Sequence, residues 1–181
     1  MKNLGIIVQN NLKWNSNTAN LCKKAYKNLW VIRRMKNLGL STETLLEYYK
    51  KEIRVHLELA VPVWHSGLTI KLSADIERVQ RVAVGIMLGS IPYTHACELL
   101  GLEPLSTRRI GLCKRFAFKT SRNSRHSDLF QLKSGQQNLR KSKKQYREHI
   151  CRKSRFYKSP LPFLTRLLNQ WITLTSTHNW C

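Results

Sequence analysis

Three features of the sequence predict a mainly α-helical protein. The 181 residues include only 8 Gly and 5 Pro, which is few for a turn-rich β sandwich. In several segments apolar side chains recur every three or four residues, the spacing of one face of a helix. Hydrophobic residues make up 42% of the chain, enough to bury a core. We therefore expect a helical bundle, preceded by a short N-terminal β hairpin and followed by a basic, partly irregular C-terminal extension.

The first 15 residues predict the hairpin. Residues 4–8 (LGIIV) are typical of a strand, Asn10 and Asn11 favour a turn, and residues 12–14 supply a short partner strand. The apolar run is too short for a signal-peptide core or a membrane span. We expect an intracellular protein, in the nucleus or the cytoplasm, that is neither secreted nor membrane-spanning.

Two helices are predicted next. The first begins at Ser16 or Asn17 and ends at Gly39, and its expected inward face consists of Leu21, Ala25, Leu29 and Ile32. Its opposite face carries Lys23, Lys27 and Arg34. The second begins after Ser41, Pro62 should kink or end it, and its apolar face consists of Leu45, Tyr49, Ile53, Leu57 and Ala60. After it, we expect Trp64 in the core and His65 at the surface.

The strongest helical periodicity lies between Gly67 and Gly89. It predicts the centre of the core from the face that contains Leu72, Ile76, Val79, Ala83, Ile86 and Met87. A short helix over residues 94–100 follows. Pro104 and Ser106 then open a helix whose expected inward face is Leu112, Cys113, Phe116 and Ala117. A last amphipathic helix is predicted over residues 159–168.

The charge of the chain indicates its partner. Lys and Arg number 32 and Asp and Glu 10, so the net charge is +22. Residues 1–107 carry +6, whereas residues 108–181, with 18 basic and 2 acidic groups, carry +16. Such an excess of positive charge favours binding to a polyanion, and nucleic acid is the partner we expect. The candidate contacts are Lys23, Lys27 and Arg34, the helical stripe Arg108, Arg115, Lys119 and Arg122, and in the basic tail Lys141, Lys143, Lys144 and Arg147.

Other classes of site find little support. The five Cys include no CxxC pair, which argues against a zinc ribbon or a disulfide framework, and Cys97 and Cys113 are expected in the core. His149 and Cys151, like His178 and Cys181, have the spacing of metal ligands, but neither pair has the further ligands that a site needs. No nucleophile elbow indicates a hydrolase. We expect no metal, no cofactor and no small-molecule substrate.

Several motifs follow one another along the chain. They are the Leu4-Gly5 pair before a hairpin, residues 53–65 (IRVHLELAVPVWH), the Leu68-Thr69 pair, and residues 76–81 (IERVQR). Further on come residues 99–102, 108–110, 112–113, 116–117, 126–130 (HSDLF) and 159–169 (SPLPFLTRLLN). In order and spacing this set resembles the region after the catalytic palm in reverse transcriptases of LINE-type (non-LTR) retrotransposons, of the jockey-like or a related animal clade. The resemblance covers nearly the whole chain.

The resemblance implies three regions. Residues 1–15 would be a remnant of the palm and primer grip, residues 16–122 a helical thumb-like domain, and residues 123–181 a basic C-terminal extension with a short terminal helix. Family members polymerise with palm aspartates, two of them adjacent, that hold two metal ions. This chain has only Asp75 and Asp128, far apart, so no residue matches that pair. We expect a truncated, non-catalytic fragment of a transposable element, whose Mg²⁺ would belong to the missing palm.

Two further hypotheses come from other classes. An autonomous basic, RNA-associated structural protein would explain the charge and size but not the collinear motifs. Binding to a membrane surface is the third hypothesis. It would need one long helix that combines a basic face with exposed large apolar residues, whereas the apolar faces predicted here match one another. The leading hypothesis is a module that grips the phosphates of a template-primer duplex or of element RNA without reading sequence.

Overall fold

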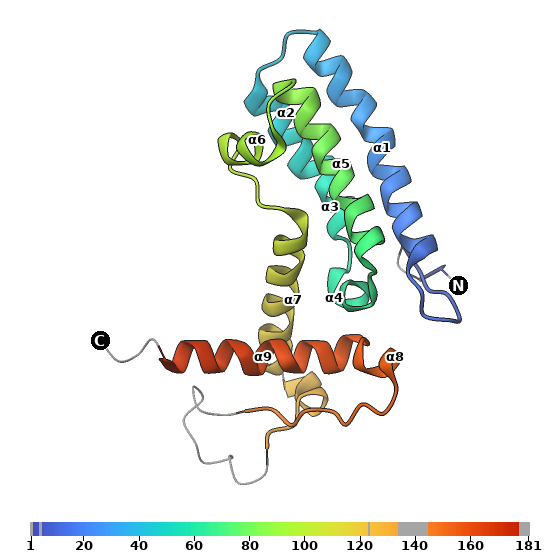
Figure 1. Ribbon diagram of the computed structural model, residues 1–181, viewed down its shortest axis with the longest axis vertical. Helices are drawn as coiled ribbons and strands as arrows, with labels where there is room; N and C mark the ends of the chain where they lie inside the picture. Colours follow the sequence, from blue (N-terminus) through green and yellow to red (C-terminus); the bar gives the residue numbers. More distant parts are fainter. Residues whose placement is uncertain (1, 4, 123, 134–144, 178–181) are drawn as a thin grey trace. The chain divides into compact units, whose positions relative to one another are not determined.

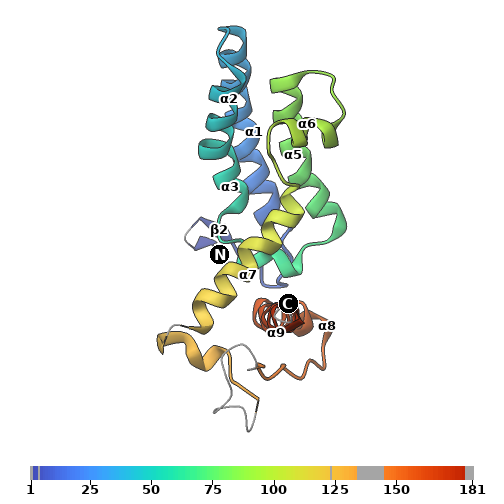
Figure 2. The same ribbon diagram turned by 90° about the vertical axis from the view of Figure 1, so that its left-hand side faces the viewer.

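The computed structural model describes residues 2–3, 5–122, 124–133 and 145–177. It is mainly helical with a two-stranded antiparallel hairpin near the N-terminus, which confirms the predicted fold class (Figures 1 and 2). The chain divides into two compact units. The first contains residues 1–60 and 68–109, and the second contains residues 61–67 and 110–181. Residues 16–122, which we expected to form one domain, are therefore divided between both units.

The hairpin forms earlier in the chain than predicted. Strand β1 (Lys2–Asn3) pairs antiparallel with β2 (Ile6–Ile7), and Gly5 lies in the turn with φ +86°. Residues 12–14, the expected partner, form no strand, so that part of the prediction is wrong. The physical reason is Gly5, which adopts the left-handed backbone of a tight turn without a steric cost and folds β2 back onto β1. Leu4, in the predicted strand, lies outside the described residues.

Two long helices form the centre of the first unit. Helix α1 (Asn15–Asn37) packs along α5 (Ile70–Leu88), and both are visible side by side in Figure 1. The inward face predicted for α1 is buried, with Leu21, Ala25, Leu29 and Ile32 at most 1% exposed. On α5 the predicted core is also confirmed for Ile76, Val79, Ala83 and Met87, while Leu72 and Ile86 are half-buried. Gly89, with φ +79°, ends α5 as predicted.

The second predicted helix is interrupted by a π-helical turn. It consists of α2 (Thr42–Tyr48), the π-helical segment Tyr49–Ile53 and α3 (Arg54–Glu58). Its buried residues are spaced by four: Leu45, Tyr49, Ile53 and Leu57. On an α-helix each step of four overshoots a turn by about 40°, so the row would drift around the helix. The wider π turn offsets this drift and keeps the row on one face.

Helix α7 carries the basic stripe and begins after α6 (Tyr93–Leu99) and Gly101. It spans Leu105–Ser121, and the division between the units falls between its residues Arg109 and Ile110. Cys113 and Ala117 are buried as predicted, but Phe116 is 46% exposed, which contradicts its assignment to the inward face. The buried row runs through Leu105, Arg109, Cys113 and Ala117, and Phe116 lies one position outside it.

The second unit is built around α9 (Pro160–Thr177), which extends beyond the predicted residue 168. Helix α4 (Val61–Trp64), the 3₁₀ turn His65–Gly67 and α8 (Ser154–Tyr157) pack against it. Trp64 is buried as predicted. His65, expected at the surface, is half-buried because its ring packs edge-on against Phe163 at 5.6 Å.

The segment before α8 is held to α9 by one amide side chain. A 3₁₀ turn (Ser124–Leu129) precedes an isolated antiparallel bridge between Leu132 and Tyr146. Asn169 of α9 accepts from the amide of Tyr146 at 2.8 Å and donates to its carbonyl at 3.0 Å. A buried amide thereby satisfies both backbone groups of a residue that has no continuous strand beside it.

Candidate nucleic-acid interface

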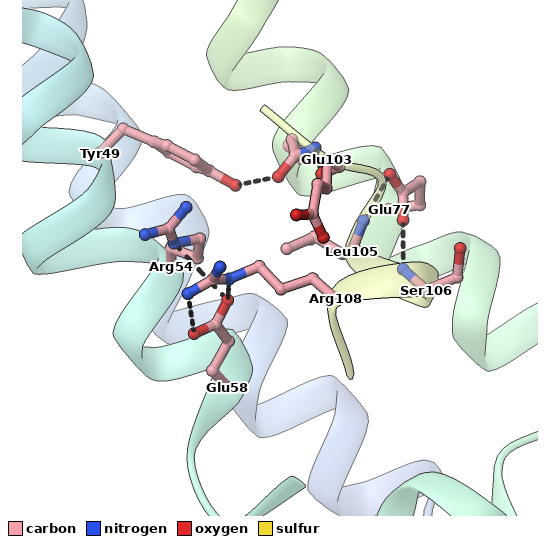
Figure 3. Close-up of polar contacts among 9 residues, drawn as sticks. Tyr49, Arg54, Glu58, Glu77, Glu103, Leu105, Ser106 and Arg108 are labelled. Atoms are coloured by element: carbon pink, nitrogen blue, oxygen red, sulfur yellow. Dashed lines mark hydrogen bonds and ion pairs between the residues drawn. The ribbon is translucent and has the colours of Figure 1, made fainter. Parts of the chain in front are cut away.

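The N-terminus of α7 is fixed by an acidic residue from α5. Both oxygens of Glu77 accept from the first amides of α7, Oε1 from Leu105 at 3.1 Å and Oε2 from Ser106 at 3.3 Å (Figure 3). These amides have no partner within the helix, and a carboxylate also interacts favourably with the positive end of the helix dipole. The carboxylate of Glu77 therefore fixes the start of α7 at Leu105 and Ser106.

Arg108, the first residue of the predicted stripe, is already paired with an acid. Its guanidinium forms a bidentate ion pair with Glu58 of α3, whose Oε1 also lies 3.5 Å from Nε of Arg54 (Figure 3). The side chains of Arg108 and Glu58 are only 30% and 15% exposed. A phosphate would have to displace this internal partner, so the structure separates Arg108 from the other three residues of the stripe.

Arg115, Lys119 and Arg122 continue the stripe in the second unit. All three are exposed, and within the described residues none of them forms an ion pair. The guanidinium of Arg122 lies 4.7 Å from the centre of the Phe118 ring, a cation–π contact that keeps the charge intact. A spacing of four residues places Arg115 and Lys119 on one side of α7, and Arg122 follows in the turn directly after its last residue. They can contact an external anion without breaking an internal pair.

A second basic face lies on α1 in the first unit. Lys23, Lys27 and Arg34 are exposed as predicted, and α1 contains no acidic residue. The same face carries an aromatic residue that the sequence reasoning did not single out, Trp30, which is 63% exposed. Trp30 is seven residues after Lys23, three after Lys27 and four before Arg34, the spacing of one helix face. That spacing was the available signal, and it was overlooked because aromatic residues are assigned to the core by default.

The predicted tail contacts are described only in part. Lys141, Lys143 and Lys144 lie outside the described residues. Arg147 is exposed, and its backbone amide donates to the carbonyl of Gln131 at 2.7 Å beside the Leu132–Tyr146 bridge. The structure therefore describes a position for Arg147 alone among these four.

A buried polar network of the first unit was also missed. Gln80 is fully buried on α5, accepts from the Tyr49 hydroxyl at 2.7 Å, and donates to the Tyr93 hydroxyl at 2.9 Å and the Glu103 carbonyl at 3.0 Å. The Tyr93 hydroxyl in turn donates to Glu77 at 2.5 Å. Each member has a partner, so this network supports the segment before α7.

Burial controls the ionisation of several groups in the first unit. It raises the pKa of the Cys22 thiol to about 11 and raises the pKa of the Tyr49 hydroxyl. Burial, and then the hydrogen bond to Glu77, raises the pKa of Tyr93. These groups are therefore neutral at physiological pH, and a protonated thiol such as that of Cys22 is a poor nucleophile. Their role is packing and hydrogen bonding.

The described residues contain no group of three or more His, Cys, Asp or Glu side chains placed to hold a metal ion. Cys151 donates from its thiol to the carbonyl of His149 at 3.2 Å, and His178 and Cys181 lie outside the described residues. None of the helices in the described part of the chain combines the length and apolar character needed to cross a membrane.

Comparison with protein-family models, with curated proteins and with solved structures finds no match to this chain. In the described part of the chain, α1 and α7 each have a face with exposed cations that form no ion pair.

Proposed function

We propose that this chain is a non-catalytic nucleic-acid-binding module that grips phosphates without reading base sequence. We further propose that it corresponds to the thumb and C-terminal part of a LINE-type reverse transcriptase, as the order of the motifs described above suggests. Its ligand would be a template-primer duplex or element RNA. The first proposal rests on charge and the second on resemblance, so they are tested separately.

The observation that carries the first proposal is the pairing of cations on α7. Arg108 is held by Glu58, whereas Arg115, Lys119 and Arg122 are exposed and have no ion pair within the described residues. A row of such cations on a rigid helix can follow a phosphate backbone. Each phosphate that it neutralises releases counterions, which makes binding favourable and independent of sequence.

Salt dependence tests the first proposal. Replacing Arg115, Lys119 and Arg122 by Ser should flatten the slope of log K against log salt on duplex DNA by up to about 2.7, at about 0.9 per phosphate contact. Affinity should fall similarly for unrelated duplex sequences, because phosphate contacts do not distinguish bases. The measurement is fluorescence anisotropy over a series of salt concentrations.

The matched control removes the same net charge from the first unit. It replaces Lys51, Lys71 and Arg78 by Ser, two of which already pair with acids, Lys51 with Glu47 and Arg78 with Asp75. Its slope should stay close to that of the wild type. A second variant replaces Lys141, Lys143, Lys144 and Arg147. If this variant loses all affinity while the α7 variant keeps the wild-type slope, the cations on α7 do not contact phosphates and the tail is the binding element.

Primer extension tests the non-catalytic part of the proposal. We expect no DNA synthesis on a primed RNA or DNA template with Mg²⁺ or Mn²⁺, because Asp75 and Asp128 do not supply the adjacent carboxylates of a two-metal site. Extension that co-purifies with the protein and survives controls for contaminating polymerase would refute it.

The genomic sequence upstream of the Met1 codon tests the resemblance. A polymerase palm there, in frame or frameshifted, would support the retrotransposon origin. Its absence would favour an autonomous RNA-associated protein.

A further inference from the structure

An apolar pocket of about 230 Å³ lies within the second unit, between α7 and α9. Its apolar wall consists of Phe118 from α7 and Leu167, Leu168 and Trp171 from α9. Lys114 and Arg115, one turn before Phe118, complete the lining together with Gly111. The phosphate-gripping proposal uses only Arg115 of these residues and leaves the pocket unexplained.

The aromatic side of this pocket is partly open to solvent. Trp171 is 38% exposed, although it is a large aromatic residue in the middle of α9. Its ring meets Phe118 edge to face, with the ring centres 4.8 Å apart and the planes at 68°. Such a contact limits the orientations of the indole. The pocket therefore offers an oriented aromatic surface beside a small apolar space.

The pocket is also positively charged. Lys114 and Arg115 line it, and the guanidinium of Arg122 lies 4.7 Å from the centre of the Phe118 ring. The second unit contains only two acidic residues, Asp128 and Glu148, and neither lines this pocket. A complementary occupant therefore combines a flat group that can stack on an aromatic ring with nearby negative charge. A nucleotide in a single strand has both, because its base is planar and its phosphates are adjacent.

We propose that this pocket receives an unpaired nucleobase of a single-stranded nucleic acid. The base stacks on Trp171, and the flanking phosphates contact Lys114 and Arg115. This inference rests on the proposed nucleic-acid binding and deepens it, because it adds a site that a fully paired duplex cannot use without flipping a base out. Stacking on aromatic side chains tolerates any base, in keeping with binding that does not read sequence.

Gly111 makes a pocket-blocking variant possible. It lies within α7 and lines the pocket, and a Cβ built on it meets no atom within 4 Å. A Leu side chain at this position therefore has room to enter the pocket, and Leu also has a higher helix propensity than Gly. Gly111→Leu should close the pocket while the fold and all cations stay in place. Trp171→Ala removes the stacking surface itself.

The test compares single strands with a duplex, using the 181-residue chain. The probes are labelled oligo(dT), oligo(U) and a blunt DNA duplex of equal length, with binding measured by anisotropy at one salt concentration. Trp171→Ala and Gly111→Leu should each weaken binding to one or both single strands roughly tenfold or more, the size expected for one lost stacking contact, and change duplex binding less than twofold. Trp171→Phe should retain part of the affinity. Comparing oligo(U) with oligo(dT) shows whether RNA or DNA supplies the base.

The controls separate the possible failures. Leu99→Ala removes an apolar side chain of the first unit that is 59% exposed on α6, outside both basic faces, and should leave the ratio of single-strand to duplex affinity unchanged. If Gly111→Leu folds normally by circular dichroism and binds single strands as the wild type does, the inference is wrong and the phosphate grip still stands. If Trp171→Ala loses the same affinity for single strands and for the duplex, Trp171 serves to pack the fold and does not stack on a base. If the wild type binds no nucleic acid, both proposals fail, and binding of anionic vesicles that Gly111→Leu abolishes would assign the pocket to a lipid surface.

Discussion

The two units use the same number of cations in different ways. Each contains 16 Lys and Arg residues, but the first contains 8 acidic residues and the second only 2. In the first unit acids hold the fold together, as Glu58 pairs with Arg108 and Glu77 caps α7. In the described part of the second unit no Lys or Arg forms an ion pair.

Contacts of other kinds replace ion pairs in the second unit. Asn169 holds the backbone of Tyr146 through its amide, and Phe118 and Trp171 pack edge to face. The guanidinium of Arg166 lies 3.8 Å from the ring centre of Tyr157 and donates to its carbonyl. None of these contacts neutralises a charge. The comparison teaches that acid placement, more than the number of cations, separates a structural Arg from one that is available to a polyanion.

The largest expected effect is on the core of the first unit. Ile76 is fully buried on α5, and Ile76→Asp should lower the free energy of unfolding by about 3–5 kcal/mol because the new carboxylate would have no partner. Arg122→Ser, on the surface of the second unit, should change it by less than about 0.5 kcal/mol. Urea unfolding followed by circular dichroism measures both. Similar midpoints for the two variants would mean that Ile76 is not central to the core.

The next effect concerns the acid that caps α7. Glu77→Ala removes the acceptor for the amides of Leu105 and Ser106 and for the Tyr93 hydroxyl, so it should cost about 2 kcal/mol of unfolding free energy. The matched control is Glu98→Ala on α6, because the Glu98 side chain is 79% exposed. The control should cost much less. Equal losses would show that Glu77 does not act as a cap.

A smaller pair of effects separates Arg108 from Arg115. Arg108→Ser leaves Glu58 with only its longer contact to Arg54. It should lower the free energy of unfolding by about 1 kcal/mol and change the salt slope of DNA binding little. Arg115→Ser should do the reverse, with unchanged stability and a slope about 0.9 flatter. Unfolding and anisotropy titrations on the same preparations test the contrast. If both variants behave alike, the ion pair with Glu58 does not give Arg108 a role different from that of Arg115.

The smallest effect is a loss of stability at alkaline pH that originates in the first unit. Burial raises the pKa of Cys22 from 9.0 to about 11, so the unfolded chain releases this proton first. The stabilisation is complete below about pH 9 and is lost as the pH rises toward 11, and the raised pKa of Tyr49 acts in the same direction. Unfolding free energies at pH 8 and 10.5 should therefore differ less in Cys22→Ala than in the wild type. If the unfolding free energy falls equally in the wild type and in Cys22→Ala, Cys22 is not a source of the loss of stability at alkaline pH.

Local patterns in the sequence were sufficient to predict most helices. Ser41 was predicted to cap α2, and Gly39 and Gly89 to end the helices before them, and the structure confirms all three, the two glycines with positive φ. Apolar spacing correctly predicted the inward faces of α1 and most of α5 because helical hydrogen bonds join residues only four apart. The same periodicity indicated that Lys23 and Lys27 are exposed, since a residue opposite a buried face points to solvent.

Only the tertiary structure decided which partners the polar and aromatic residues meet. Arg108 and Glu58 are 50 residues apart, and no local pattern indicates that one neutralises the other. In the same way Gly111 of α7 and Trp171 of α9 are 60 residues apart in the sequence, and they line one pocket only because the two helices come together. The periodicity of apolar residues determines which face of a helix is exposed to solvent. Whether a cation on that face is already paired, or an aromatic ring borders a pocket, depends on segments brought together by folding.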